Sequence, residues 1–193
     1  PLRDIAYTIE KAGKCHNIIV LGEDQKLYFE QLSAALKIMG YAAPEAVHYS
    51  FVLLEEGKMS TRKGNLVLLE DFMKEAAKKA MEEIKKRHGK IDEMAAKKIG
   101  YGAIKYSILR VSPEKNVIFN WQRALSFEGE SAPYIQYAYA RIWSILRKYN
   151  KKIDSKIKYN LLDKKEEIEL IKKLSEFPNT ISKVTGNLKP HII

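Results

Sequence analysis

Residues 56–65 read Glu56-Gly57-Lys58-Met59-Ser60-Thr61-Arg62-Lys63-Gly64-Asn65. Three cations and two hydroxyl groups fall within Lys58 to Lys63, and a glycine stands on each side of them. Apolar residues lie before this stretch, from Tyr49 to Leu54, and again after it. Lysine and arginine supply positive charge to phosphoryl groups, and glycines let the backbone hinge close to a ligand. The stretch therefore predicts a phosphate-binding loop between a strand and a helix, although a solvated basic loop has the same composition.

A strand–helix–strand pattern precedes this stretch. Residues 18–21 form a short apolar run typical of a buried strand, and residues 48–54 form a second one. Between them the spacing predicts a helix over residues 27–39, which Gly40 ends. The apolar face of this helix carries Tyr28, Leu32, Ala35, Leu36 and Met39. Such a unit builds a parallel sheet through a right-handed crossover, and ligands bind beyond the carboxyl ends of its strands, where residues 22–25 and the basic stretch fall.

Helices dominate the rest of the chain. Periodic apolar residues predict helices over residues 70–87, 92–110, 133–148 and 163–177. The residues expected to begin or end them are Asp92, Ser131 and Asp163 as N-caps, and Phe177-Pro178 as the stop of the last helix. Gly100 and Gly102 weaken the second of these helices unless a neighbour packs closely against them. The predicted fold class is α/β followed by all-α.

The composition favours an anionic partner. The 193 residues carry a formal charge of +10 with a pI near 9.4, which indicates nucleic acid or an anionic membrane as the partner. No apolar run approaches the roughly 20 residues that span a bilayer, and no charged-then-apolar leader begins the sequence. Cys15 is the single cysteine, which fits a reducing compartment. We therefore expect a cytoplasmic protein with no membrane contact and no protein-bound metal.

Five segments resemble one known family, in the same order along the chain. They are Leu2–Tyr7, Gly22–Lys26, Lys58–Asn65, Ala124–Gly129 and Pro133–Ile142. Together they are similar to the class I aminoacyl-tRNA synthetases, in the arginyl-tRNA synthetase form. The family's signature loop is written K-M-S-K-S, and this chain has Thr61 in place of the second lysine. The resemblance leaves open whether Lys63 or an upstream residue stands in for that lysine.

The resemblance implies which residues act. Enzymes of this family activate arginine with ATP, with Mg²⁺ expected beside the nucleotide, and then charge tRNA(Arg). Lys58, Ser60 and Lys63 would be catalytic and would steady the phosphates as pyrophosphate leaves. The residues expected to bind ATP are Gly22, Asp24, His48, Lys58, Met59 and Ser60, and those expected to bind arginine are Asp4 and Gln25.

Several of these residues also have structural interpretations. Asp4 has the position of an N-cap for a short helix that ends at Gly13. Asp24 and Gln25 precede a helix and are suited to capping it. His48 has the position of a strand-edge histidine with satisfied hydrogen bonds. The sequence leaves these alternatives open.

The expected tRNA contacts lie in the C-terminal helices. The candidates for phosphate contact are Arg141, Arg147, Lys148 and Lys151. A solvated basic face has the same composition, so that alternative stays open. The helix over residues 133–148 also carries an apolar stripe that is predicted to pack in a core. The stripe consists of Tyr134, Ala138, Ile142, Ile145 and Tyr149.

The resemblance also implies the organisation of the chain. Residues 1–69 would be the second half of a Rossmann-like parallel sheet in the catalytic domain. Residues 70–128 would be a helical connecting segment, and residues 129–193 the beginning of a truncated helical anticodon-binding bundle. The expected partners are tRNA(Arg), arginine and ATP, and the expected state is a monomer.

One catalytic element of the class is missing from the sequence. No H-I-G-H-type element occurs, and Pro1 opens the chain directly on motif-like residues, which suggests an excerpt from a longer protein. We therefore predict that this polypeptide alone does not form adenylate. The alternative is a non-catalytic tRNA-binding module, and an upstream reading frame with a H-I-G-H-type element would favour the enzyme. A kinase-like nucleotide binder is disfavoured because no Walker-type motif is present.

Overall fold

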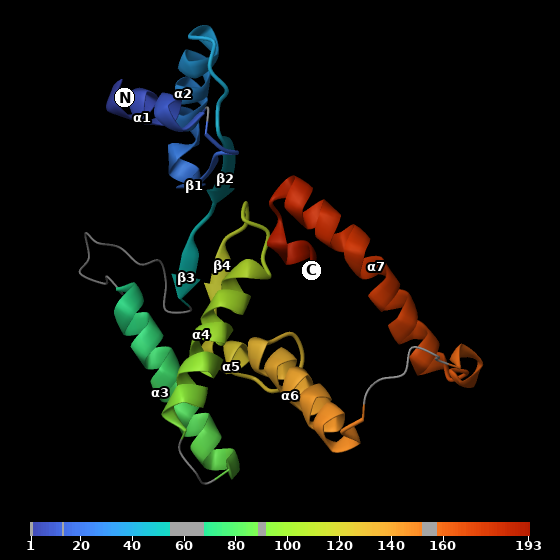
Figure 1. Ribbon diagram of the computed structural model, residues 1–193. Coiled ribbons are helices and arrows are strands. Elements are labelled where there is room, and N and C mark those ends of the chain that lie inside the picture. Colours follow the sequence, from blue (N-terminus) through green and yellow to red (C-terminus); the bar gives the residue numbers. More distant parts are fainter. Residues whose placement is uncertain (1, 13, 55–67, 89–91, 152–157) are drawn as a thin grey trace. The chain divides into compact units, whose positions relative to one another are not determined.

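The computed structural model describes residues 2–12, 14–54, 68–88, 92–151 and 158–193 (Figure 1). The chain divides into two compact units. The first comprises Pro1–Lys58 and Val111–Ile118, and the second comprises Met59–Arg110 and Phe119–Ile193. Short parallel strands come first and a helical region follows, so the predicted fold class is confirmed. The boundaries expected at residues 69/70 and 128/129 stay predictions.

The first unit is built on a strand–helix–strand element (Figure 1). Its elements are α1 (Leu2–Ala12), β1 (Ile18–Gly22), the short 3₁₀ helix η1 (Glu23–Gln25), α2 (Lys26–Ile38) and β2 (Glu45–Tyr49). Strands β1 and β2 are parallel, with Ile18 opposite Glu45 and Gly22 opposite Tyr49, as the pattern predicted. Helix α2 is followed by Gly40 at φ +80°, a left-handed conformation that glycine adopts without a Cβ penalty.

The strand predicted over residues 48–54 is wrong as a single strand. Strand β2 ends at Tyr49, and β3 (Val52–Leu54) belongs to a separate two-stranded sheet with β4 (Val117–Phe119). Between β2 and β3, the Ser50 amide donates to the Pro113 carbonyl at 2.8 Å, and the Phe51 amide donates to Oδ1 of Asn116 at 3.2 Å. The apolar run is continuous in the sequence, but partners distant along the chain divide it between two sheets.

Two long helices form the centre of the second unit. Helix α3 (Leu69–His88) lies beside α4 (Glu93–Leu109), as Figure 1 shows. The predicted N-cap is confirmed, because Oδ1 of Asp92 accepts a hydrogen bond from the Ala95 amide at 2.9 Å. The predicted close approach is confirmed as well. A Cβ added at Gly100 would lie 2.6 Å from the backbone of Ala76, and one added at Gly102 would lie 2.7 Å from Nε2 of Gln136. The glycines therefore let both neighbouring helices approach α4.

Two further long helices and several short ones make up the rest of the described chain. They are α5 (Trp121–Ala124), α6 (Ala132–Tyr149), η3 (Tyr159–Leu161), α7 (Lys165–Asn187) and η4 (Pro190–Ile192). Ser131 caps α6 as predicted, since its hydroxyl accepts from the Tyr134 amide at 3.3 Å. The last predicted helix is wrong at both ends: its N-cap is Lys164, not Asp163, and it continues through Pro178. Proline removes one helical hydrogen bond, but its fixed φ is compatible with a helix, so α7 bridges it.

The apolar faces of α6 and α7 are exposed in this chain. Tyr134 is 49% exposed, Ile142 57% and Ile145 60%, so the prediction that this stripe packs in a core is wrong for the chain as it stands. Helical spacing identifies an apolar face but does not identify what covers it. In the part of the chain that the structure describes, no helix is both long enough and apolar enough to cross a membrane.

Candidate functional site

A cavity of about 450 Å³ lies between α1, β1 and α2 in the first unit. It is lined by Asp4, Tyr7, Thr8, Lys11, Asn17, Ile18, Ile19, Leu21, Gln25, Tyr28, Leu32 and Pro44. The four residues from α1 recur at the spacing of one helical face. Asp4 and Gln25 come from different elements, and both were predicted to bind arginine. The structure brings these two side chains to one cavity.

Asp4 is held by a tyrosine from the neighbouring helix. The Tyr28 hydroxyl donates to Oδ2 of Asp4 at 2.7 Å. This hydrogen bond lowers the pKa of the Asp4 carboxyl and raises the pKa of the Tyr28 phenol, because it stabilises the carboxylate and the neutral phenol together. Asp4 lies inside the first turn of α1, which begins at Leu2, so the N-cap interpretation is wrong. The sequence had placed Tyr28 on the apolar face of its helix, and no spacing signal pointed to this contact.

Asp24 and Gln25 do not cap the following helix through their side chains. Gln25 occupies the N-cap position of α2, but its side chain makes no capping hydrogen bond. Asp24 lies within η1, whose N-cap is Gly22. The Asp24 carboxylate folds back toward Gly22, where an added Cβ would lie 2.5 Å from Oδ1. The capping interpretation is therefore wrong for Asp24, and for Gln25 it holds for the position but not for the side chain. Both residues are exposed at the end of β1.

His48 lies on β2, opposite Leu21 of β1. Its ring packs edge-on against Phe29, with 5.6 Å between the ring centroids. Its Nδ1 atom is buried and has no hydrogen-bond partner among the described residues. The interpretation of His48 as a fully satisfied histidine is therefore wrong at Nδ1. Buried polar atoms are normally paired, so an unpaired ring nitrogen is available to a ligand or a water.

The signature stretch lies outside the described residues. Lys58, Met59, Ser60 and Lys63 all fall within residues 55–67. The elements on either side of this segment are a strand, β3, and a helix, α3, as the sequence predicted. The roles of these four residues stay predictions. Elsewhere in the described part of the chain, no group of three or more His, Cys, Asp or Glu side chains is placed to hold a metal ion.

The candidate tRNA contacts lie along and after α6. Arg141 donates to the Tyr137 hydroxyl at 3.1 Å, one helical turn earlier. Arg147 and Lys148 are exposed in the last turn of α6, and Lys151 is exposed beyond it. Cations in a last turn also stabilise the negative end of the helix dipole. Stabilisation of the C-terminal end of α6 is therefore an alternative role for Arg147 and Lys148, beside the predicted phosphate contacts.

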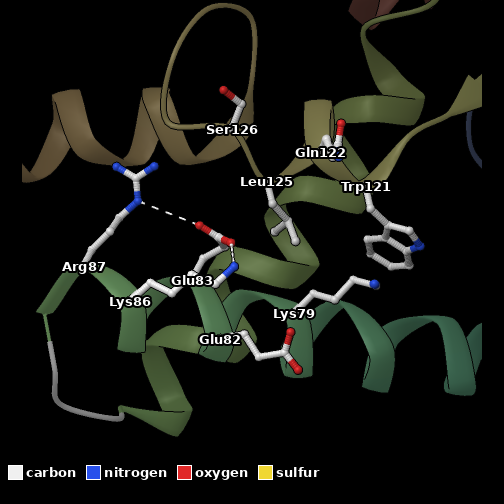
Figure 2. Close-up of a pocket in the computed structure, with 9 residues that line it drawn as sticks. All are labelled: Lys79, Glu82, Glu83, Lys86, Arg87, Trp121, Gln122, Leu125 and Ser126. Atoms are coloured by element: carbon white, nitrogen blue, oxygen red, sulfur yellow. Dashed lines mark hydrogen bonds and ion pairs between the residues drawn. The ribbon is translucent and has the colours of Figure 1, made fainter.

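A second cavity, of about 460 Å³, lies in the second unit between α3, α5 and the residues after α5. Figure 2 shows its charged wall, where Glu83 pairs with Lys86 at 2.8 Å and with Arg87 at 4.0 Å. The Arg87 guanidinium also lies 4.4 Å from the centre of the Phe127 ring, and Lys79 lies 5.5 Å from that of Trp121. These cations are already engaged, so the cavity is poorly suited to binding an anion. No motif in the sequence predicted it.

Comparison with known proteins identifies the family of the chain. Residues 2–121 match the family described as tRNA synthetases class I (R), catalytic domain, and residues 135–193 match the DALR anticodon binding domain. The chain is 45% identical over 197 residues to arginine–tRNA ligase of Methanocella arvoryzae. It is 44% identical over 193 residues to that of Methanocaldococcus jannaschii. Each alignment covers 99% of this chain and 34% of the relative.

The fold also matches part of a solved structure. Thermus thermophilus arginyl-tRNA synthetase superposes with a TM-score of 0.77 at 30% identity, over 93% of this chain and 30% of that one. The chain thus spans about a third of the length of the relatives that it matches. Since the catalytic-domain match covers more than half of its residues, the chain belongs to the arginyl group of the class I tRNA synthetases.

Proposed function

We propose that this chain carries the arginine-selecting part of an arginine–tRNA ligase. In the first step, the carboxylate of arginine attacks the α-phosphorus of ATP, forming arginyl-adenylate and releasing pyrophosphate. In the second step, the arginyl group passes to the terminal adenosine of tRNA(Arg) and AMP leaves. The observation that carries this proposal is the cavity shared by Asp4 and Gln25.

Asp4 and Gln25 select arginine by charge and hydrogen bonding. A carboxylate matches the planar fork of a guanidinium group through two parallel hydrogen bonds. The Gln25 amide supplies a further acceptor in its carbonyl oxygen. The cavity, at about 450 Å³, is within the usual range for small-ligand sites. The lowered pKa of Asp4 keeps the carboxylate ionised, which supports the same role.

ATP binds at the carboxyl ends of β1 and β2. Gly22 ends β1, Asp24 follows it, and His48 lies near the end of β2. Parallel sheets bind ligands at this end of their strands. The unpaired Nδ1 of His48 supports a ligand contact there. Lys58, Met59, Ser60 and Lys63 complete the ATP site, and the two lysines neutralise charge on the departing pyrophosphate. Mg²⁺ accompanies ATP and is held largely by its phosphates.

The helical C-terminal part docks tRNA. The match of residues 135–193 to an anticodon-binding family and the formal charge of +10 support this assignment. The cations proposed to contact phosphates are Arg141, Arg147, Lys148 and Lys151. We expect the protein to act as a monomer in the cytoplasm.

A non-catalytic tRNA-binding module is the second candidate, because the sequence contains no H-I-G-H-type element. Arginine-dependent ATP–pyrophosphate exchange, measured with and without tRNA(Arg), separates the two candidates. It should be measured for the 193-residue chain and for the longest reading frame that contains it. The enzyme predicts exchange by the longer form and none by the 193-residue chain. Tight tRNA(Arg) binding by the longer form without any exchange would establish the module instead.

A further inference from the structure

We propose that Tyr28 is a positioning residue, which orients the Asp4 carboxylate toward the guanidinium group of the substrate. The proposal rests on the proposed function, since it assigns a role within the same cavity. Tyr28 comes from α2 and Asp4 from α1, and their side chains are joined at 2.7 Å. Both residues line the cavity that also contains Gln25.

The contact ties the Asp4 side chain to the neighbouring helix. Asp4 is exposed, whereas Tyr28 is half-buried on α2 next to the buried Leu32. The phenol is thus the better-fixed partner, and its hydrogen bond limits the rotation of the carboxylate. Fixing a ligand-binding group before the ligand arrives lowers the entropy that binding must overcome.

The contact leaves room for a guanidinium fork. An ionised carboxylate has about four lone-pair sites, and Tyr28 occupies one of them, on Oδ2. A guanidinium fork needs two of these sites, so the Tyr28 contact does not by itself exclude it. Tyr28 and the substrate can therefore bind Asp4 at the same time. If they instead competed for Oδ2, removing the hydroxyl would strengthen arginine binding, so the sign of the effect decides between the two arrangements.

The test is Tyr28→Phe in the longest reading frame that contains this chain, followed by arginine-dependent ATP–pyrophosphate exchange. We expect the KM for arginine to rise about fivefold, as for the loss of one ordinary hydrogen bond, because Tyr28 acts on the substrate only through Asp4. We expect the KM for ATP and the kcat to stay within twofold of the parent values. Tyr41→Phe is the matched control, because it removes a hydroxyl from an exposed tyrosine just after α2, outside the cavity. It should change none of these constants.

A double-mutant cycle separates positioning from general structural support. If Tyr28 acts through Asp4, Tyr28→Phe has no further effect on the KM for arginine once Asp4→Asn is present. An additive effect in that background would overturn the proposal, as would an unchanged or a lowered KM in Tyr28→Phe alone. Absence of arginine-dependent exchange in the unsubstituted protein, both with and without tRNA(Arg), would instead show that the proposed function itself is wrong. Thermal melting of each variant identifies any loss that comes from unfolding. If Tyr28→Phe unfolds, the cycle is repeated with Tyr28→Leu, whose side chain has no hydrogen-bond donor.

Discussion

The hydroxyl of Tyr28 on α2 donates to Oδ2 of Asp4 on α1 across 2.7 Å. This hydrogen bond joins two helices that line the cavity proposed to bind arginine. It also keeps a carboxylate ionised where a cationic substrate is expected to bind.

The first prediction concerns the titration of Asp4. Its pKa lies below the ordinary value of 3.8, because Tyr28 stabilises the charged form. The pair therefore stabilises the folded protein above the pKa that Asp4 has in the unfolded chain, and this contribution is lost as the pH falls through the lower folded pKa. In Tyr28→Phe, the titration midpoint of the Asp4 carboxyl should move upward, as followed by ¹³C NMR. A midpoint that is unchanged by the substitution would show that the hydrogen bond is not formed in solution.

The second prediction concerns the contact between α3 and α4. Gly100→Ala should lower the free energy of unfolding by about 1–3 kcal/mol, the usual cost of overpacking. The added Cβ would lie 2.6 Å from the backbone of Ala76, and a rotamer change cannot relieve a clash with backbone. Gly186→Ala on α7 is the control, since an added Cβ there meets no described atom within 4 Å. It should be neutral or stabilising by up to about 1 kcal/mol. Equal urea midpoints for the two variants would contradict the close approach of the helices.

The third prediction concerns the signature stretch. Lys58→Ala and Lys63→Ala in the longest reading frame should each slow adenylate formation by about 10- to 100-fold, because each removes positive charge from the developing pyrophosphate. Binding of tRNA should change much less. Lys37→Ala, which removes an exposed cation from the last turn of α2, is the control for charge alone. If exchange rates are unaffected in both loop variants, the phosphate role of the stretch is wrong.

The fourth prediction concerns the tRNA surface. Arg147→Gln and Lys148→Gln should each weaken tRNA binding at all sequences alike. Each should also reduce the slope of log K against log salt by about one, as expected when one phosphate contact is lost. Lys14→Gln removes the same charge from a lysine that pairs with Glu10 at 3.3 Å, far from this cluster in the sequence. An equal loss of tRNA affinity in this control would show that the effect comes from net charge. An unchanged salt slope in all variants would show that Arg147 and Lys148 belong to a solvated face.

Local chemistry made much of this fold predictable from the sequence. Asp92 and Ser131 cap their helices as short polar residues do, and Gly100 marks a close helix approach because no other residue leaves enough space. The parallel pairing of β1 with β2 followed from the alternation of strand and helix. Each of these features is decided by residues near one another in the sequence or by a single missing Cβ.

The features that could not be predicted depend on distant partners. The break at Ser50 depends on Pro113 and Asn116, which no pattern in the apolar run reveals. The sequence pattern places Tyr28 on the apolar face of its helix, yet its hydroxyl contacts Asp4, 24 residues earlier. The family resemblance identified Asp4 and Gln25 as candidates for binding arginine. The contact of Tyr28 with Asp4 became evident only in the structure.

The account depends most directly on Asp4 as the group that selects arginine. The decisive measurement is the KM for arginine in ATP–pyrophosphate exchange by Asp4→Asn, in the longest reading frame that contains this chain. Removing the charge while keeping the shape should raise this KM about a hundredfold, since one partner of a charge pair is lost. The KM for ATP and the melting temperature should barely change. A KM for arginine equal to that of the parent protein would contradict the assignment of this cavity to the substrate.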